Sequence, residues 1–167
     1  MHKIIKRHWR IIIPILIMGI IFYFSSCQSA TSESLSKPIA DFFGLSHELT
    51  RKIAHFILFA SLGASWAYYL RVLGRFTPGF TALGSLLFVF AYAVLDEIHQ
   101  IFIPGRAGLF SDVLLDAVAG IVGIFVFDTL YYLTRSKQQR TARRKQVDQI
   151  WANNAKLIKK LQKPPKK

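Results

Sequence analysis

The sequence has few of the features that hold small secreted or water-soluble proteins together. Its 167 residues include a single cysteine, Cys27, so no intramolecular disulfide can form. Charged residues make up only 19% of the chain, whereas aromatic residues make up 14%. A disordered chain has the opposite balance, with much charge and few aromatic residues. The composition therefore excludes both a disulfide scaffold and an intrinsically disordered protein.

The short motifs of common catalytic and metal centres are also absent. The sequence contains no HExxH, CxxC or GxSxG and no glycine-rich phosphate loop. No metal, cofactor or nucleophile can therefore be assigned from spacing alone. Any functional site has to be inferred from where polar residues fall in the fold.

Apolar residues are abundant, at 52% of the chain, and they occur in long runs. A helix needs about 20 apolar residues to cross about 30 Å of hydrocarbon. Stretches that meet or nearly meet this length lie at about 11–27, 53–73, 80–103 and 109–133. The first lacks the small-residue cleavage site of a signal peptide. We therefore predict an all-α fold, a four-helix transmembrane bundle formed by residues 1–135 in the lipid bilayer.

The net charge of +13 is unevenly distributed and predicts the orientation of the spans. Four Lys or Arg precede the first span, and twelve lie from Arg135 onward. Cytoplasmic loops carry an excess of Lys and Arg. We expect both termini to be cytoplasmic, with the loop 28–50 and the loop at Pro104 outside. A basic chain also suits nucleic acid, but the apolar runs favour a membrane, so no nucleic-acid partner is expected.

The last segment, residues 136–167, differs from the spans in composition. It holds eleven Lys or Arg and one acid, Asp148. Its apolar residues recur at helical spacing: Val147, Ile150, Trp151, Leu157, Ile158 and Leu161. This pattern predicts a basic amphipathic C-terminal helix that lies on the anionic lipids of the inner leaflet. A 3-4-3-4 spacing with Asn154 at one core position would also suit a short coiled coil, so oligomers are an alternative.

Ionisable residues near the ends of three predicted spans form the candidate site. Each costs roughly 2.5–3.5 kcal/mol at the centre of a membrane-spanning helix on insertion scales. In the predicted topology, the second span begins, the third ends and the fourth begins on the outer side. The sequence therefore predicts one outer layer of polar side chains, called the polar cluster below: Lys52, His55, Asp96, Glu97, Gln100, Arg106, Asp112 and Asp116.

Two interpretations of this layer stay open. It could be an electrostatic clasp, in which buried ion pairs only hold helices together. It could instead be a site, with His55, Glu97 and Asp96 as acid–base groups. The remaining members would then bind the substrate: Lys52, Gln100, Arg106, Asp112 and Asp116. Asp112 and Asp116 could also bind a divalent cation.

Helical spacing refines the expected geometry of the polar cluster. Lys52 and His55 are three residues apart, and Asp112 and Asp116 are four apart, so each pair shares a helix face. Asp116 continues into a stripe of small residues that permits close helix packing: Ala119, Gly120 and Gly123. We therefore expect the two aspartates to face protein. His99 is expected to face lipid headgroups.

Three sequence segments resemble a known family. They are FYFSS at Phe22–Ser26, RKIAHFILFASLG at Arg51–Gly63 and DEIHQIFIPGRAGLFSDVLLDAVAG at Asp96–Gly120. This combination resembles the VanZ-like family of small multi-span bacterial membrane proteins, over about residues 11–133. Cys27 stands where that family often has Gln, and the tail lies outside the resemblance.

The resemblance implies a class of protein and a phenotype. The first known members of the family are associated with low-level teicoplanin resistance, so a role in glycopeptide tolerance is implied. Two functions remain open. One is an envelope protein of the bacterial cell membrane whose outer pocket binds a lipid headgroup or cell-wall precursor. The other is a membrane-embedded enzyme that acts on such a headgroup by acid–base or metal-assisted chemistry.

Overall fold

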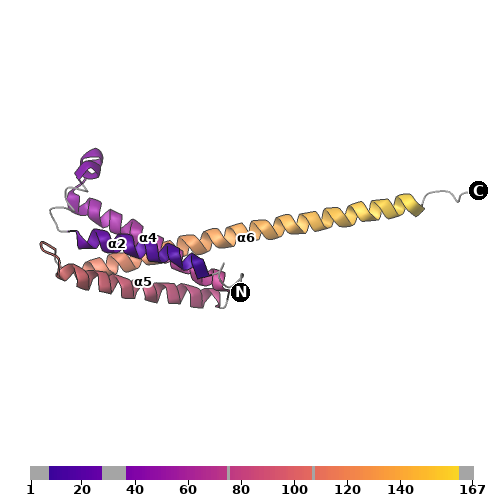
Figure 1. Cartoon of the computed structure of the whole chain (residues 1–167). Coiled ribbons are helices and arrows are strands. Elements are labelled where there is room, and N and C mark those ends of the chain that lie inside the picture. The colour runs from indigo at the N-terminus through magenta and orange to yellow at the C-terminus, as the bar shows by residue number, and fades with distance from the viewer. Residues whose placement is uncertain (1–7, 28–36, 75, 107, 162–167) are drawn as a thin grey trace, which may run out of the picture. The chain divides into compact units, whose positions relative to one another are not determined.

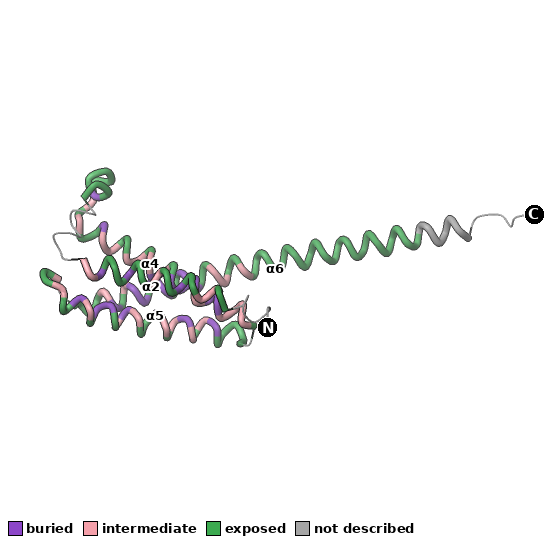
Figure 2. Tube along the Cα trace, in the orientation of Figure 1, coloured by how far each residue is buried: buried purple, intermediate pink, exposed green. Residues whose placement is uncertain are grey.

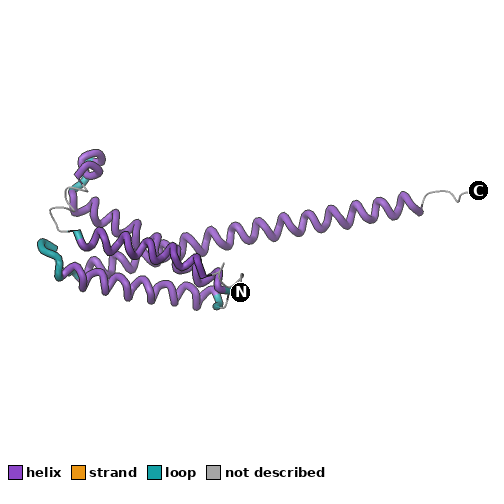
Figure 3. Tube along the Cα trace, in the orientation of Figure 1, coloured by secondary structure: helices purple, strands orange, loops and turns teal. Residues whose placement is uncertain are grey.

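The structure, a computed structural model, describes residues 8–27, 37–74, 76–106 and 108–161, with side chains as far as residue 154. All regular elements in these ranges are helices (Figure 3). They are η1 (Trp9–Ile11), α2 (Ile12–Ser26), a short helix at residues 37–43, α4 (His47–Leu73), α5 (Pro78–Ile101) and α6 (Phe110–Leu161). The first seven residues, the loop 28–36 and the end of the tail lie outside the described residues.

Four stretches of the described chain are long and apolar enough to cross a membrane: Trp9–Ser26, His47–Leu73, Pro78–Ile101 and Phe110–Asn154. The predicted all-α fold with four spans in contact with lipid is therefore confirmed. The second span begins six residues earlier than the sequence pattern predicted, because the polar start of α4 is helical too.

Local sequence signals explain where these helices begin and end. Ser46 caps the start of α4, and its side chain accepts a hydrogen bond from the Leu49 N–H at 3.2 Å. Gly74 ends α4 in the left-handed conformation, with φ at 64°, which a glycine adopts without steric cost. Thr77 caps α5, and Pro78 follows at the first helical position, where its missing N–H is tolerated.

Close contact between α4 and α6 sets the distance between these two helices (Figure 1). A Cβ built on Gly63 would lie 3.0 Å from the Gly120 Cα, and one built on Gly123 would lie 2.9 Å from the Ala60 Cα. Glycine is the only residue that fits at such distances. The predicted small-residue stripe does face protein, and the prediction is confirmed.

A small apolar core fills the space between the four helices up to Asp128. Its fully buried members come from α2, α4, α5 and α6: Ile21, Phe59, Leu62, Val89 and Ala119. Only 17–33% of the most apolar window of each span is buried inside the protein. Figure 2 shows exposed residues along much of each helix. Apolar side chains such as Leu16 and Phe125 lie on this outer surface, as expected for helices surrounded by lipid.

At the end of the bundle remote from the polar cluster, three polar contacts join the helices. Arg71 of α4 pairs with Asp128 of α6. His8 Nδ1 lies 3.3 Å from the Tyr69 hydroxyl, and the Arg10 guanidinium lies over the ring of Tyr68. These contacts close the predicted inner end of the bundle.

The fourth span and the tail form one element rather than two. The sequence pattern predicted a span at 109–133 and a separate helix in the tail, whereas α6 is unbroken from Phe110 to Leu161. No glycine or proline occurs between Gly123 and Pro164, so nothing in the sequence interrupts the helix. The chain divides into two compact units inside α6, Met1–Asp128 and Thr129–Lys167. In the second unit, Val147, Ile150 and Trp151 are exposed.

Candidate functional site

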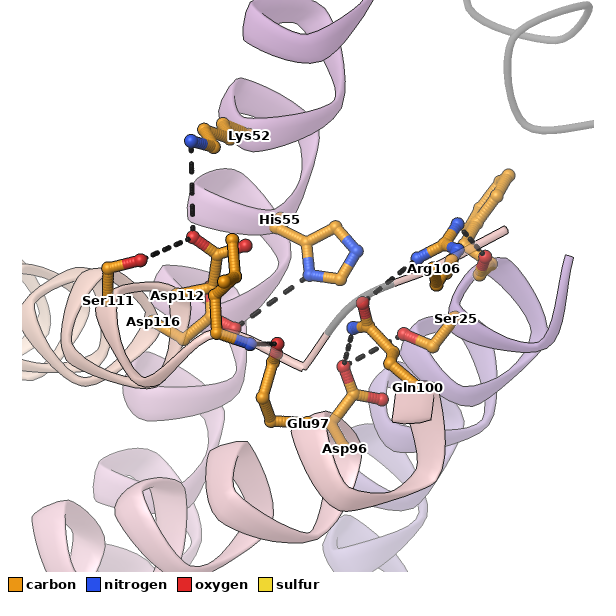
Figure 4. A network of polar contacts seen from close by, with 12 residues as sticks. Ser25, Lys52, His55, Asp96, Glu97, Gln100, Arg106, Ser111, Asp112 and Asp116 are labelled. Atoms are coloured by element: carbon orange, nitrogen blue, oxygen red, sulfur yellow. Dashed lines mark hydrogen bonds and ion pairs between the residues drawn. The ribbon is translucent and has the colours of Figure 1, made fainter. Parts of the chain in front are cut away.

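The first turns of α4 face the first turns of α6 at the site (Figure 4). Lys52 Nζ lies 2.9 Å from Glu48 Oε1 on its own helix and 4.0 Å from Asp112 Oδ1 on α6. One turn further into the bundle, His55 Nδ1 lies 3.8 Å from Asp116 Oδ2. The two pairs predicted from helical spacing therefore meet face to face.

The end of α5 contributes a deeply buried carboxylate. Asp96 is only 4% exposed. Its Oδ2 accepts hydrogen bonds from Ser25 Oγ at 2.8 Å and from Gln100 Nε2 at 2.9 Å. Its Oδ1 is buried and has no hydrogen-bond partner among the described residues. An unsatisfied carboxylate oxygen at this depth is costly, so the geometry around Asp96 indicates more than a structural role.

Glu97 links α5 to the start of α6. It is 6% exposed, and its Oε1 accepts a hydrogen bond from the Leu109 N–H, just before α6 begins. A carboxylate at this point satisfies a backbone donor and interacts favourably with the positive end of the α6 dipole. Glu97 therefore has a structural contact beside any chemical role.

Arg106 lies on the loop between α5 and α6 and binds the end of α2. Its Nε donates to the Cys27 carbonyl at 3.1 Å, one terminal nitrogen donates to the Phe24 carbonyl at 3.0 Å, and the other donates to Gln100 Oε1 at 3.3 Å. The last carbonyls of a helix lack intrahelical partners, so the guanidinium caps α2. Burial lowers the pKa of Arg106, yet an arginine stays protonated in proteins. The sequence predicted substrate binding for Arg106, and the structure ties it to α2 and Gln100.

A pocket opens between α4, α5 and α6. It has a volume of about 290 Å³, part of it open to the outside, and it is lined by Arg51, Lys52, His55, Glu97, Gln100, Asp112, Leu115 and Asp116. Of the eight residues predicted from the sequence, six line this pocket. Asp96 lies beside it, bonded to Gln100, and Arg106 is joined to it through the same glutamine.

Sequence reasoning missed three polar residues of this region. Arg51 lines the pocket and makes no ion pair or hydrogen bond within the described part of the chain. Ser25 is fully buried against Asp96, and Ser26 Oγ lies 3.1 Å from His99 Nε2. The segment FYFSS and the position of Arg51 beside Lys52 were the available signals.

The expectation for His99 is wrong. Its ring stacks on Phe22 of α2, with the ring centroids 4.7 Å apart, and it contacts Ser26. Ser26 Oγ donates to the Phe22 carbonyl, so His99 Nε2 carries the proton that it shares with Ser26. The residue faces α2 because α2 packs beside the end of α5, a contact that α5 alone does not predict.

Comparison with known families agrees with this geometry. The model of the VanZ/LLP1 family matches residues 10–132. The chain belongs to this family. The VanZ/LLP1 match includes every member of the polar cluster and ends inside α6, before the tail. No curated protein and no solved structure matches the chain.

The charges of the VanZ/LLP1 site are unbalanced. Its carboxyl groups belong to Asp96, Glu97, Asp112 and Asp116. The permanent cations close to them are Arg51 and Lys52, while Arg106 binds the end of α2. Chemically, the rim can hold an anion, and the acidic layer with His55 can accept a proton or bind a cation.

Proposed function

We propose that this VanZ/LLP1 protein is a bacterial envelope protein that binds a phosphate-bearing lipid headgroup or lipid-linked cell-wall precursor at the outer face of the membrane. Binding would change how the precursor is presented and so influence glycopeptide tolerance. Both termini are placed in the cytoplasm on the positive-inside rule. The tail would then associate with the inner leaflet through its basic residues.

The observation that carries this proposal is the pair of cations on the rim of the pocket. Arg51 and Lys52 are half-buried side chains at the same opening. A guanidinium and an ammonium together match phosphate, because arginine binds two oxygens in its planar fork and lysine adds a point charge. Arg51 has no protein partner within the described residues that would compete for its donors. A volume of about 290 Å³ suits one headgroup phosphate rather than a large ligand.

Lipid binding to the purified protein tests the proposal. The protein in phosphatidylcholine nanodiscs would be titrated with phosphatidic acid, or with a polyprenyl pyrophosphate to represent a precursor, and bound lipid counted by native mass spectrometry. Arg51→Met should weaken binding about tenfold or more, as expected for losing a charge-assisted hydrogen bond. Lys52→Met keeps the apolar stem and should also weaken binding.

A control separates the pocket from general charge attraction. Lys137→Met removes one cation from the exposed tail and should leave the lipid stoichiometry and affinity of the pocket unchanged. The lipid that binds more tightly identifies the headgroup class. If both rim variants bind both lipids as the parent does, the pocket does not hold phosphate.

A second candidate function, a membrane-embedded enzyme, is favoured by one observation. His55 lies in the pocket below the cationic rim and beside Asp116, where an imidazole could act as a general base toward a bound headgroup. Glu97 and Asp96 would be the other candidate acid–base groups. Release of phosphate or headgroup from the bound lipid, absent in His55→Gln, would favour the enzyme. Stable binding without turnover would favour the binding protein.

A further inference from the structure

Three potential metal ligands from three helices converge beside the pocket. One ligand atom each from His55 of α4, Asp96 of α5 and Asp116 of α6 lie within 4.8 Å of one another. Asp96 and Asp116 are 4% and 3% exposed, and the His55 side chain is 13% exposed. From this arrangement we infer that the three residues bind a divalent transition-metal cation of the zinc or manganese type. The inference goes beyond headgroup binding and does not depend on it.

The polar contacts in the protein do not satisfy these groups. The distance of 3.8 Å between His55 and Asp116 is too long for a hydrogen bond. Asp96 receives hydrogen bonds only from the neutral donors Ser25 and Gln100, and its Oδ1 is buried without a partner in the described chain. Buried charges in proteins are paired or coordinate metals. A cation shared by the two aspartates would satisfy both.

The spacing is close to that of an occupied site. Zinc binds nitrogen and oxygen ligands at about 2.0–2.2 Å, so two ligand atoms on opposite sides of one ion are about 4.2 Å apart. The longest separation among the three atoms, at most 4.8 Å, exceeds this value only slightly. Rotation of a carboxylate about its broad terminal torsion closes such a gap. Ser25 and Gln100 would orient Asp96 in the way that outer hydrogen-bond partners orient metal ligands.

The ligand types select the class of cation. Imidazole suits zinc and other transition metals, whereas magnesium and calcium prefer sites made of oxygen atoms alone. One imidazole and two carboxylates provide three protein ligands, which leaves a coordination position open. That position would face the pocket, since His55 and Asp116 line it. The excess of carboxylates over cations in this layer also favours a bound positive ion.

Zinc binding to the whole protein tests the inference. The purified chain in non-ionic detergent would be equilibrated with Zn²⁺ alone, without added lipid, and desalted. Bound zinc would be measured by elemental analysis and affinity by calorimetry. We expect about one zinc ion per chain. Asp96→Asn and Asp116→Asn should lower the affinity more than about 100-fold, because even losing an outer hydrogen-bond partner of a ligand costs about 10–100-fold. Ser25→Ala should cost that smaller amount.

Asp112→Asn is the matched control. Asp112 lies one turn before Asp116 on α6 and lines the same pocket, but it is not one of the three converging residues. Its variant should bind zinc with an affinity within a few fold of the parent. Circular dichroism and gel filtration without zinc would check the fold. If an aspartate variant does not fold, His55→Gln replaces it.

Two results would overturn the metal site. The parent could retain no zinc after desalting. Alternatively, Asp96→Asn and Asp116→Asn could retain zinc with the affinity of the parent, which would place the ion elsewhere. Neither result bears on phosphate binding, because that test depends on Arg51 and Lys52 and contains no zinc.

Discussion

Substituting a single glycine tests the packing on which the site depends. In Gly123→Ala, the new Cβ would lie 2.9 Å from the Ala60 Cα, and ordinary contacts of this kind begin at about 3.4 Å. The helices α4 and α6 must therefore part by at least about 0.5 Å. Overpacking of this kind costs about 1–3 kcal/mol of unfolding free energy. The same change at Gly19, which has no atom within 4 Å, should stabilise α2 by about 0.5–1 kcal/mol.

The two variants form a matched pair, because each adds one methyl group to a helix. Unfolding in mixed micelles, followed by circular dichroism during a titration with sodium dodecyl sulfate, measures both. We expect Gly123→Ala to be less stable than Gly19→Ala by about 1.5–4 kcal/mol. Gly123 lies two turns after Asp116 on α6, so the variant should also weaken zinc binding. Equal stability of the two variants would refute the close approach of α4 and α6.

Three further predictions concern the site, the topology and the tail. Glu97→Gln keeps an acceptor for the Leu109 N–H, so melting temperature should stay near the parent's while any glycopeptide-tolerance phenotype is lost; Glu97→Ala should cost about 1–3 kcal/mol of stability. Unchanged phenotype in stable Glu97→Gln would remove Glu97 from the site. Reporter fusions after Arg135 should give a cytoplasmic signal, and an external one would reverse the placement of the pocket. Deleting residues 137–167 should weaken association with anionic lipid but leave zinc binding intact, measured by vesicle flotation and elemental analysis; loss of the folded core would make the tail part of it.

The spans could be predicted because hydrocarbon thickness fixes their length and composition. The start of α4 could not, since Glu48 and Lys52 do not fit an apolar pattern, and its helical state depends on the Ser46 cap. The continuity of α6 was missed for a related reason. A change of composition after Tyr132 suggested a boundary, but helix formation ends only where a breaking residue or tertiary contact ends it.

The convergence of the polar cluster could be predicted from topology and helical periodicity. Those two arguments state which end and which face a residue occupies, and they placed Asp112 and Asp116 opposite Lys52 and His55. They do not state which helices are neighbours. The contribution of α2 was therefore missed, although Ser25 holds Asp96 and the end of α2 holds Arg106.

The choice between a clasp and a site turns on whether the bundle needs buried charges to stay together. Close packing at Gly63 and Gly123 already joins α4 to α6 without them. A clasp would also be expected to pair each buried carboxylate with a cation, since leaving a buried charge unpaired costs about 3–5 kcal/mol. Asp96 has only neutral hydrogen-bond donors around it in the described chain, and Arg51 lines the pocket without an ion pair there. A clasp would leave neither group in this state, whereas a site that takes a cation below and a phosphate at its rim requires both.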